Sequence, residues 1–154
     1  MDITPFFIAV RDAPFSIIKL LFDYGGSIEY GQLLHFAISR ASLDRLEVFE
    51  YILNKRASVN AIIFQNYLES YKQEKYSGLG TPLYSAAEKG NLNIIQILLV
   101  KGANPLIKDS TGRLTIGLAR YYGHNKVVEY LRPLSVPSSE PYYNFTDSRR
   151  IGTD

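Results

Sequence analysis

Few side chains in this sequence could carry out catalysis, and none of them has the spacing of a known active site. The chain has two histidines, His35 and His124, and no cysteine, which excludes thiol nucleophiles and metal sites that need cysteine ligands. It contains no glycine-rich phosphate loop, no H-E-x-x-H metal motif and no G-x-S-x-G nucleophile turn. We therefore predict no metal, no cofactor and no catalytic residue on the basis of motifs.

Acid–base chemistry without a cofactor is the alternative that the composition leaves open. The chain holds 12 tyrosines and 8 phenylalanines, and aromatic side chains commonly line small-molecule pockets. If such a pocket forms, the candidate proton donors and acceptors in it are His35, Glu69, Glu88 and Tyr84. Those groups would suit an isomerase or a cyclase that needs no cofactor.

The composition is that of one folded domain without a strongly charged surface. Of the 154 residues, 46% are hydrophobic and 21% are charged, and the formal net charge is +2, which argues against disorder and against a nucleic-acid partner. No apolar run reaches the roughly 18 residues of a transmembrane helix. The N-terminal segment also lacks the basic start of a secretory signal. We expect no membrane partner and a cytoplasmic location, with the nucleus as the alternative.

A repeated pattern with a period of 33 residues organises most of the chain. Its clearest copy, at 80–104, reads GTPLYSAAEKGN, continues with paired aliphatic residues and ends in GAN. One period later the pattern returns, since Thr81 to Leu114 and Gly90 to Gly123 are both 33 residues apart. A third copy with the same internal spacing lies near the N-terminus, and a degraded copy follows it.

Each copy has the features of two short antiparallel helices. A threonine can cap the first helix with its hydroxyl, and a proline at the next position loses no needed hydrogen bond. A glycine in mid-repeat permits the turn, and the paired aliphatic residues form an apolar stripe of helical period. Because a helix pair this short cannot bury its apolar face alone, successive pairs must stack. The sequence therefore predicts an all-α solenoid of helix-turn-helix repeats.

The pattern resembles the ankyrin repeat, whose motif is T-P-L-H-x-A followed by a glycine and a closing L-L-x-x-G-A. The resemblance covers about residues 4–131, which is five sixths of the chain. It implies a repeat domain over 1–132 and a Pro/Ser-rich tail over 133–154. The repeats are then at about 4–27, 31–60, 80–108 and 112–132, the second of them degenerate.

The copies depart from the family motif at its histidine. That histidine is kept only as His35, and the other copies have Phe7, Tyr84 and Gly117 in its place. The family uses histidines to brace helix starts and turns, so the resemblance implies structural roles for both His35 and His124.

An insert of irregular length, at 61–79, separates the second and third repeats. Its apolar residues recur at helical spacing and are Ile63, Phe64, Tyr67, Leu68 and Tyr71. We predict an extra amphipathic helix of about three turns that ends at Ser77-Gly78. At this position it would overhang the concave groove, either as a lid or gripping element or as a flap over the seam between two poorly matched repeats.

The two ends of the chain raise separate hypotheses. The tail after Pro133 is either mobile or packed back along the solenoid through Tyr142, Tyr143 and Phe145. The first repeat carries Phe6, Phe7, Ile8, Phe15 and Phe22, most of which should face the second repeat. If the remainder are exposed, they favour a homo-oligomer through this face. The start of the pattern at residue 4 also fits a fragment of a longer array.

The resemblance implies which residues face a partner. In the family, the two residues before the mid-repeat glycine face the groove, and the hairpin before the fourth repeat adds further contacts. The predicted partner-binding residues are Arg11, Asp12, Ser39, Arg40, Glu88, Lys89, Asp109, Thr111, Arg113, Tyr121 and Tyr122. For the charged members, ordinary solvated helix ends are the competing interpretation.

The leading functional hypothesis is a module that binds another protein through the concave groove. The alternative is a small-molecule site or cofactor-free enzyme in an aromatic-lined pocket under the 61–79 insert. A closed and largely apolar cavity would favour the alternative, whereas an open and continuous groove would favour a protein partner.

Overall fold

The computed structural model describes residues 5–28, 32–66 and 68–135, and all regular structure within these ranges is helical. The four helix pairs are α1 (Pro5–Asp12) with α2 (Phe15–Asp23), α3 (Leu33–Ser39) with α4 (Arg45–Asn54), α6 (Pro82–Glu88) with α7 (Leu92–Val100), and α8 (Thr115–Tyr121) with α9 (Asn125–Leu131). The insert contains α5 (Leu68–Glu74) and the 3-10 turn η1 (Lys75–Ser77), and a second 3-10 turn, η2 (Arg132–Leu134), follows α9.

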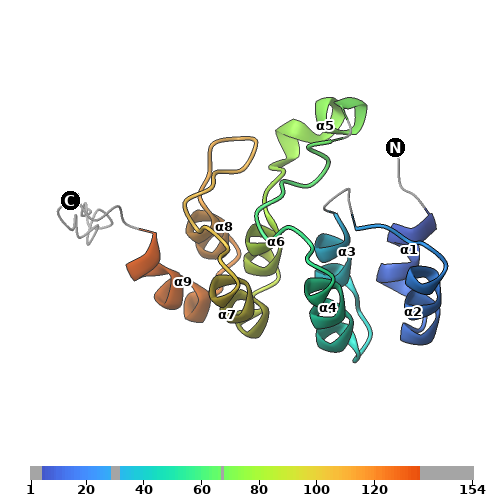
Figure 1. The fold of residues 1–154 in the computed structure, drawn as a ribbon. Helices are drawn as coiled ribbons and strands as arrows, with labels where there is room; N and C mark the ends of the chain where they lie inside the picture. Colours follow the sequence, from blue (N-terminus) through green and yellow to red (C-terminus); the bar gives the residue numbers. More distant parts are fainter. Residues whose placement is uncertain (1–4, 29–31, 67, 136–154) are drawn as a thin grey trace, which may run out of the picture.

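The pairs stack side by side in sequence order, as Figure 1 shows. The inner helices α1, α3, α6 and α8 each contact the next in line, and each also contacts the outer helix of its own pair. This is the arrangement of an ankyrin-type solenoid, so the predicted fold class is confirmed. None of the described helices is both long enough and apolar enough to cross a bilayer.

The third repeat begins and turns as its residues predict. Thr81 Oγ1 accepts a hydrogen bond from the Tyr84 N–H at 3.4 Å, and Pro82 occupies the first turn of α6. Asn91 Oδ1 caps α7 by accepting the Ile94 N–H at 3.2 Å. Between these two helices Gly90 has a φ of +64°, a conformation in which a Cβ would be strained.

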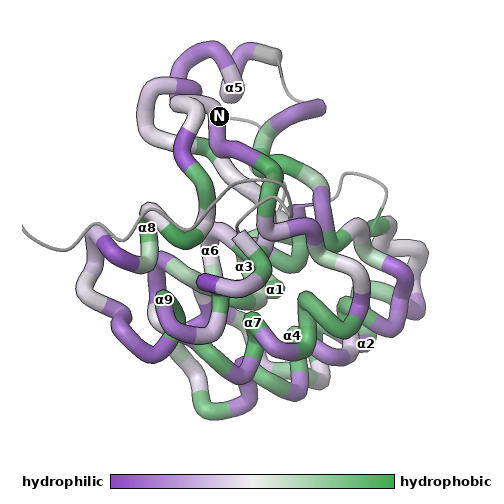
Figure 2. Tube along the Cα trace, turned by 90° about the vertical axis from the view of Figure 1, so that its left-hand side faces the viewer, coloured by the Kyte–Doolittle hydropathy of each residue, from purple (hydrophilic) through white to green (hydrophobic). Residues whose placement is uncertain are grey.

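One continuous hydrophobic core runs through all four pairs. It extends from Phe7 in the first repeat to Leu131 in the last, and the paired aliphatic residues of the sequence pattern lie inside it. The fully buried side chains include Ile18, Leu34, Phe49, Ile52, Leu83, Ile95, Leu98 and Leu131. The insert differs, because α5 stands away from the stacked pairs and is largely hydrophilic (Figure 2).

The aromatic residues of the first repeat mostly face the second, as predicted. Phe7 stacks on Phe36 with ring centroids 5.2 Å apart, and Phe15 meets Tyr51 edge to face at 5.2 Å. Ile8 of the same repeat is exposed. Whether this end of the solenoid self-associates stays a prediction.

The predicted helix of the insert is shorter than its apolar spacing indicated. Residues 63–66 form turns, and α5 begins only at Leu68. The Ile63 N–H bonds to the Gly80 carbonyl at 3.1 Å, and Phe64 has a φ of +62°, so neither residue is helical. The predicted end is correct, because Gly78 follows η1 in the left-handed conformation.

Several sequence predictions lie outside the described residues. They concern the threonine at position 4, Tyr67 and the part of the tail at 136–154, including Tyr142, Tyr143 and Phe145.

Because the repeats share one core, replacing a buried leucine by alanine should lower the free energy of unfolding far more than replacing an exposed one. Leu98→Ala should lower the free energy of unfolding by about 2–5 kcal/mol, because its side chain is fully buried between repeats. Leu43→Ala removes the same atoms from an exposed loop and should cost less than about 0.5 kcal/mol. Urea denaturation followed by circular dichroism measures both, and similar losses would contradict this packing.

Candidate functional site

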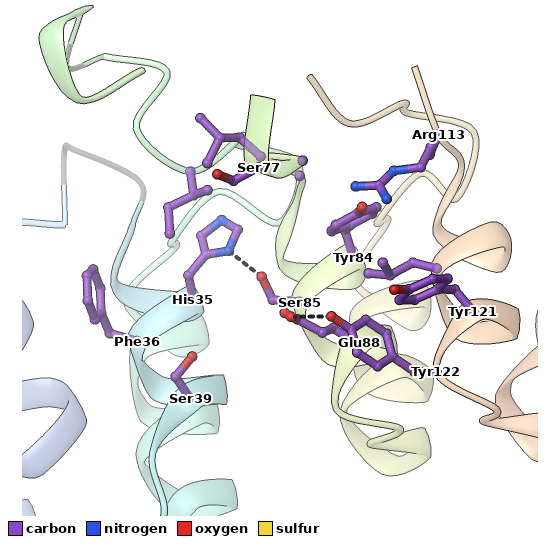
Figure 3. A pocket seen from close by; sticks show the side chains of 15 residues that line it. His35, Phe36, Ser39, Ser77, Tyr84, Ser85, Glu88, Arg113, Tyr121 and Tyr122 are labelled. Atoms are coloured by element: carbon purple, nitrogen blue, oxygen red, sulfur yellow. Dashed lines mark hydrogen bonds between the residues drawn. The ribbon is translucent and has the colours of Figure 1, made fainter. Parts of the chain in front are cut away.

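A hollow of about 390 Å³ lies on the inner side of the solenoid, between α3, α6, α8 and the end of the insert (Figure 3). Helix α3 contributes Ser39 to its lining, and α6 contributes Ser85 and Glu88. Residues 77–79 of the insert, with Gly80 next to them, supply part of the rim. The other lining residues are His35, Phe36, Ile63, Tyr84, Arg113, Leu118, Tyr121 and Tyr122.

His35 braces the floor of this hollow. Its Nδ1 lies 2.8 Å from Ser85 Oγ, and its Nε2 lies 3.2 Å from the carbonyl oxygen of Ala61. Burial lowers the pKa of His35 to about 4, although the Ala61 hydrogen bond opposes the shift. The ring is therefore neutral near pH 7 and ties α3, α6 and the start of the insert together, which agrees with the structural role that the resemblance implied.

Asp109 is a structural anchor, and its prediction as a partner contact is wrong. Its side chain is inaccessible to solvent. One carboxylate oxygen accepts the Thr111 N–H at 2.9 Å, the Thr111 hydroxyl at 2.8 Å and the Arg113 N–H at 2.8 Å. The other accepts the Tyr84 hydroxyl at 2.5 Å and Arg113 Nε at 3.0 Å. Burial raises the pKa of Asp109, but the hydrogen bonds outweigh it and lower the pKa to about 2.

Asp109 and Arg113 belong to the hairpin between the third and fourth repeats, and this hairpin also holds the end of the insert. The Ser110 N–H donates to the Leu79 carbonyl at 2.9 Å, and the Leu79 N–H donates to Ser110 Oγ at 2.7 Å. The Ser110 hydroxyl in turn donates to the Lys75 carbonyl. Gly78 packs so closely against Arg113 that a side chain there would collide with the guanidinium. The end of the insert is thus bound to the hairpin between the third and fourth repeats, at the edge of the hollow.

Asn60, the residue just before the insert, ties the second repeat to the third. Asn60 Nδ2 donates to the Gly102 carbonyl at 3.1 Å, and Asn60 Oδ1 accepts the Asn104 N–H at 2.8 Å. The insert itself is connected to the second repeat at Ala61, and to the hairpin between the third and fourth repeats at Leu79. Both ends of the insert therefore border the hollow, through Ile63 and residues 77–79.

Arg40 is a second predicted contact that the structure places in the interior. It is only 2% exposed and forms a bidentate ion pair with Asp44, at 2.6 and 2.7 Å. Its remaining donor group reaches the carbonyls of Val10 and Arg11 at 3.2 and 3.3 Å. The hydrogen bonds from Arg40 lower the pKa of Asp44 to about 2. Because its donors are used in joining the first two repeats, Arg40 is not available to a partner.

The other predicted residues divide into two groups. Five of them line the hollow and are exposed: Ser39, Glu88, Arg113, Tyr121 and Tyr122. Four are exposed but lie outside it: Arg11, Asp12, Lys89 and Thr111. Arg11 and Asp12 pair with each other at 2.8 Å.

Two tyrosines form one wall of the hollow at the end of α8. Their rings meet edge to face with centroids 5.1 Å apart, and Tyr122 also stacks on His124 at 6.3 Å. His124 Nε2 lies 2.8 Å from the Glu88 carbonyl, which holds the stack against α6. The Tyr122 hydroxyl donates a long hydrogen bond, 3.4 Å, to Glu88 Oε1. Tyr121 and Tyr122 remain 78% and 48% exposed.

The hollow is an open groove rather than a closed apolar cavity. Exposed side chains line it on α3, α6 and α8, and its lining mixes serines, charges and aromatic rings. The four candidates for acid–base chemistry are not all brought together, because Glu69 lies outside the hollow and pairs with Lys72 at 3.1 Å. No three potential metal ligands are grouped among the described residues.

Sequence reasoning missed Ser85 as a lining residue. Ser85 precedes Glu88 by three positions on α6 and therefore shares its helix face. That spacing could have placed both in the groove. The contributions of Ile63 and Ser77 had no such signal, because they depend on how the insert folds.

Comparisons with known proteins agree with the fold. The ankyrin repeat family model matches residues 80–110, which is the clearest copy of the pattern. A putative ankyrin repeat protein of Rickettsia bellii is 32% identical over 103 residues, covering 64% of this chain and 53% of the relative. Cyclin-dependent kinase inhibitor 2A of Monodelphis domestica is 43% identical over 54 residues, covering 35% of this chain and 32% of the relative.

A third relative is matched over a much smaller part of its length. The human espin-like protein is 38% identical over 58 residues, covering 38% of this chain and 6% of the relative. The chain thus spans at most about half of the length of these relatives. The prediction of an ankyrin repeat is confirmed by the family model, the relatives and the helical architecture.

His35 predicts a specific pH dependence of stability. An unfolded histidine takes up a proton near pH 6.5, whereas the folded protein resists protonation of His35 until about pH 4. Stability from this group is complete above pH 6.5 and is lost as the pH falls towards 4, by about 2 kcal/mol between pH 7 and pH 5. His35→Gln should flatten that part of the profile in urea denaturation. Parallel profiles for the two proteins would contradict the prediction.

The contacts of the buried Asp109 carboxylate predict that it stabilises the fold and keeps the end of the insert in place. Asp109→Asn should lower the free energy of unfolding by about 3 kcal/mol or more, because buried donors lose a charged acceptor. Asp23→Asn, at the exposed end of α2, is the matched control. Hydrogen exchange at the Leu79 amide should accelerate only in the Asp109 variant. An unchanged exchange rate there would show that the hairpin does not hold the insert.

Proposed function

We propose that this ankyrin-type solenoid binds another protein, and that a segment of the partner lies in the groove over α3, α6 and α8. Ankyrin repeats are in general protein-interaction modules. One relative, the cyclin-dependent kinase inhibitor, is named for its action on another protein, which supports the same class of partner.

The observation that carries the proposal is the exposed pair Tyr121 and Tyr122 at the wall of the groove. Tyrosine is among the residues that contribute most to binding when an interface buries it. The edge-to-face contact and the stacking on His124 hold the two rings in place before a partner arrives. Little side-chain entropy then remains to be lost on binding.

The frame around the groove supports the same interpretation. The hairpin between the third and fourth repeats, at Asp109 and Ser110, holds one end of the insert, while His35 joins its other end to the second and third repeats. A partner would therefore meet a surface whose backbone is already arranged. Such preorganised interfaces change little on binding.

The alternative, a cofactor-free enzyme, has less support at this site. Both ring nitrogens of His35 have partners, and the Tyr84 hydroxyl donates to Asp109. Burial raises the pKa of Tyr84, and the Asp109 hydrogen bond raises it further, which opposes ionisation near neutral pH. Glu88 alone among the lining candidates presents an exposed acid–base group. We therefore do not propose a reaction.

Peptides selected from a random display library for binding to the whole chain provide a test. Tyr121→Ala and Tyr122→Ala should each weaken binding of most selected peptides by about tenfold or more, because they remove aromatic anchors. Tyr24→Ala and Tyr130→Ala are matched controls, since both tyrosines are exposed but lie outside the hollow.

Fluorescence anisotropy with labelled peptides measures the dissociation constants. If the groove variants and the controls bind equally well, the groove is not the binding surface. If no peptide binds the wild-type chain above background, the proposal fails as well.

A further inference from the structure

The groove holds one negative charge without a counter-ion. Its charged lining residues are Glu88 and Arg113, because burial keeps His35 neutral near pH 7. Arg113 is balanced, since its Nε lies 3.0 Å from the buried carboxylate of Asp109. Glu88 forms no ion pair with any residue in the described ranges, and Lys89 beside it lies outside the hollow. The local charge therefore favours a cation.

Hydrogen bonding on the floor of the groove also favours a ligand that donates hydrogen bonds. The Ala61 carbonyl can only accept, so the proton of the neutral His35 ring must be on Nε2. Nδ1 is then an acceptor, and the Ser85 hydroxyl must donate its proton to it. Ser85 Oγ consequently has only lone pairs left for the groove. A ligand that donates hydrogen bonds can satisfy this oxygen, whereas one that only accepts cannot.

The two tyrosines complete the environment of a cation. The Tyr122 hydroxyl reaches Glu88, so the ring and the carboxylate lie on the same side of the groove (Figure 3). The face of a tyrosine ring attracts a lysine or arginine within about 6 Å of its centroid. The methylene stem of such a side chain can also pack against aromatic rings while its charge reaches a carboxylate.

We propose that the groove binds a lysine or arginine side chain of the partner protein. The basic group lies at Glu88, donates a hydrogen bond to Ser85 Oγ and packs against Tyr121 and Tyr122. This inference rests on the proposed function, because it specifies the chemistry of the segment that the groove receives. Arg113, held by Asp109, disfavours a second cation near the insert and so limits the site to one.

Titration of the whole ¹⁵N-labelled chain with single amino-acid probes tests the recognition of a cation directly. N-acetyl-arginine amide and N-acetyl-lysine amide should shift the amide signals of Ser85, Glu88, Tyr121 and Tyr122 saturably, with dissociation constants of the order of millimolar. N-acetyl-citrulline amide and N-acetyl-norleucine amide have nearly the same shapes without the charge. They should bind about tenfold more weakly or not at all.

Substitution of the carboxylate tests its role with little change in shape. Glu88→Gln should weaken binding of the cationic probes about tenfold, and Ser85→Ala should weaken it by a smaller factor. Glu47→Gln, which removes an exposed carboxylate on α4, is the matched control and should bind as the wild type does. Equal binding by the Glu88 and Glu47 variants would overturn the proposal. So would an absence of saturable shifts, or tighter binding of N-acetyl-glutamate amide than of the cationic probes.

The display-selected peptides separate failure of this inference from failure of the proposed function. Replacement of one basic residue by citrulline should weaken a groove-binding peptide about tenfold, and it should no longer matter in the Glu88→Gln protein. Peptides that depend on Tyr122 but need no basic residue would refute the cation site and leave the protein-binding groove intact. Peptides that ignore both Tyr122 and Glu88 would refute both.

Discussion

The structure depends on the sharing of apolar surface between neighbouring helix pairs. Each pair has helices of only seven to ten residues, too short to bury an apolar stripe without a neighbour. The core is therefore one cluster that runs through every repeat. Because stacking uses the sides of the inner helices, side chains such as Glu88 and Tyr121 at the ends of α6 and α8 remain exposed. The groove is a consequence of this arrangement.

The repeats differ in the polar groups that define the start of their first helix. In the third repeat a threonine cap and a proline define the start of α6. In the fourth, α8 begins at Thr115, and the residue before it, Leu114, provides no side-chain cap. The buried Thr115 hydroxyl has no partner among the described residues. Stacking on α6 and the hairpin centred on Asp109 take over part of that role. The loss of a local signal is offset by contacts with the neighbouring repeat.

The groove is lined by side chains of two kinds: some form contacts within the fold, and others remain exposed. Asp109 and Arg113 balance each other, and His35 uses both of its nitrogens to join three segments of the chain. Asp109 and His35 are therefore not free for a ligand, and the charge of the half-exposed Arg113 is already balanced. Glu88, Tyr121 and Tyr122 retain exposed surface on the same side of the hollow. The proposed partner contact follows from this difference between residues engaged in intramolecular contacts and residues that remain exposed.

The sequence by itself determined the helix pairs and their order, because the period of 33 residues reports which faces must be buried together. It also placed Glu88, Tyr121 and Tyr122 in the groove. It could not show that Arg40 and Asp109 are internal, since an exposed and a buried charge look alike until their partners, up to 30 residues away along the chain, are known. Nor could apolar spacing reveal that Ile63 and Phe64 leave the helical conformation. Only tertiary contacts decided this, because the Ile63 amide finds its acceptor at Gly80, on the other side of the insert.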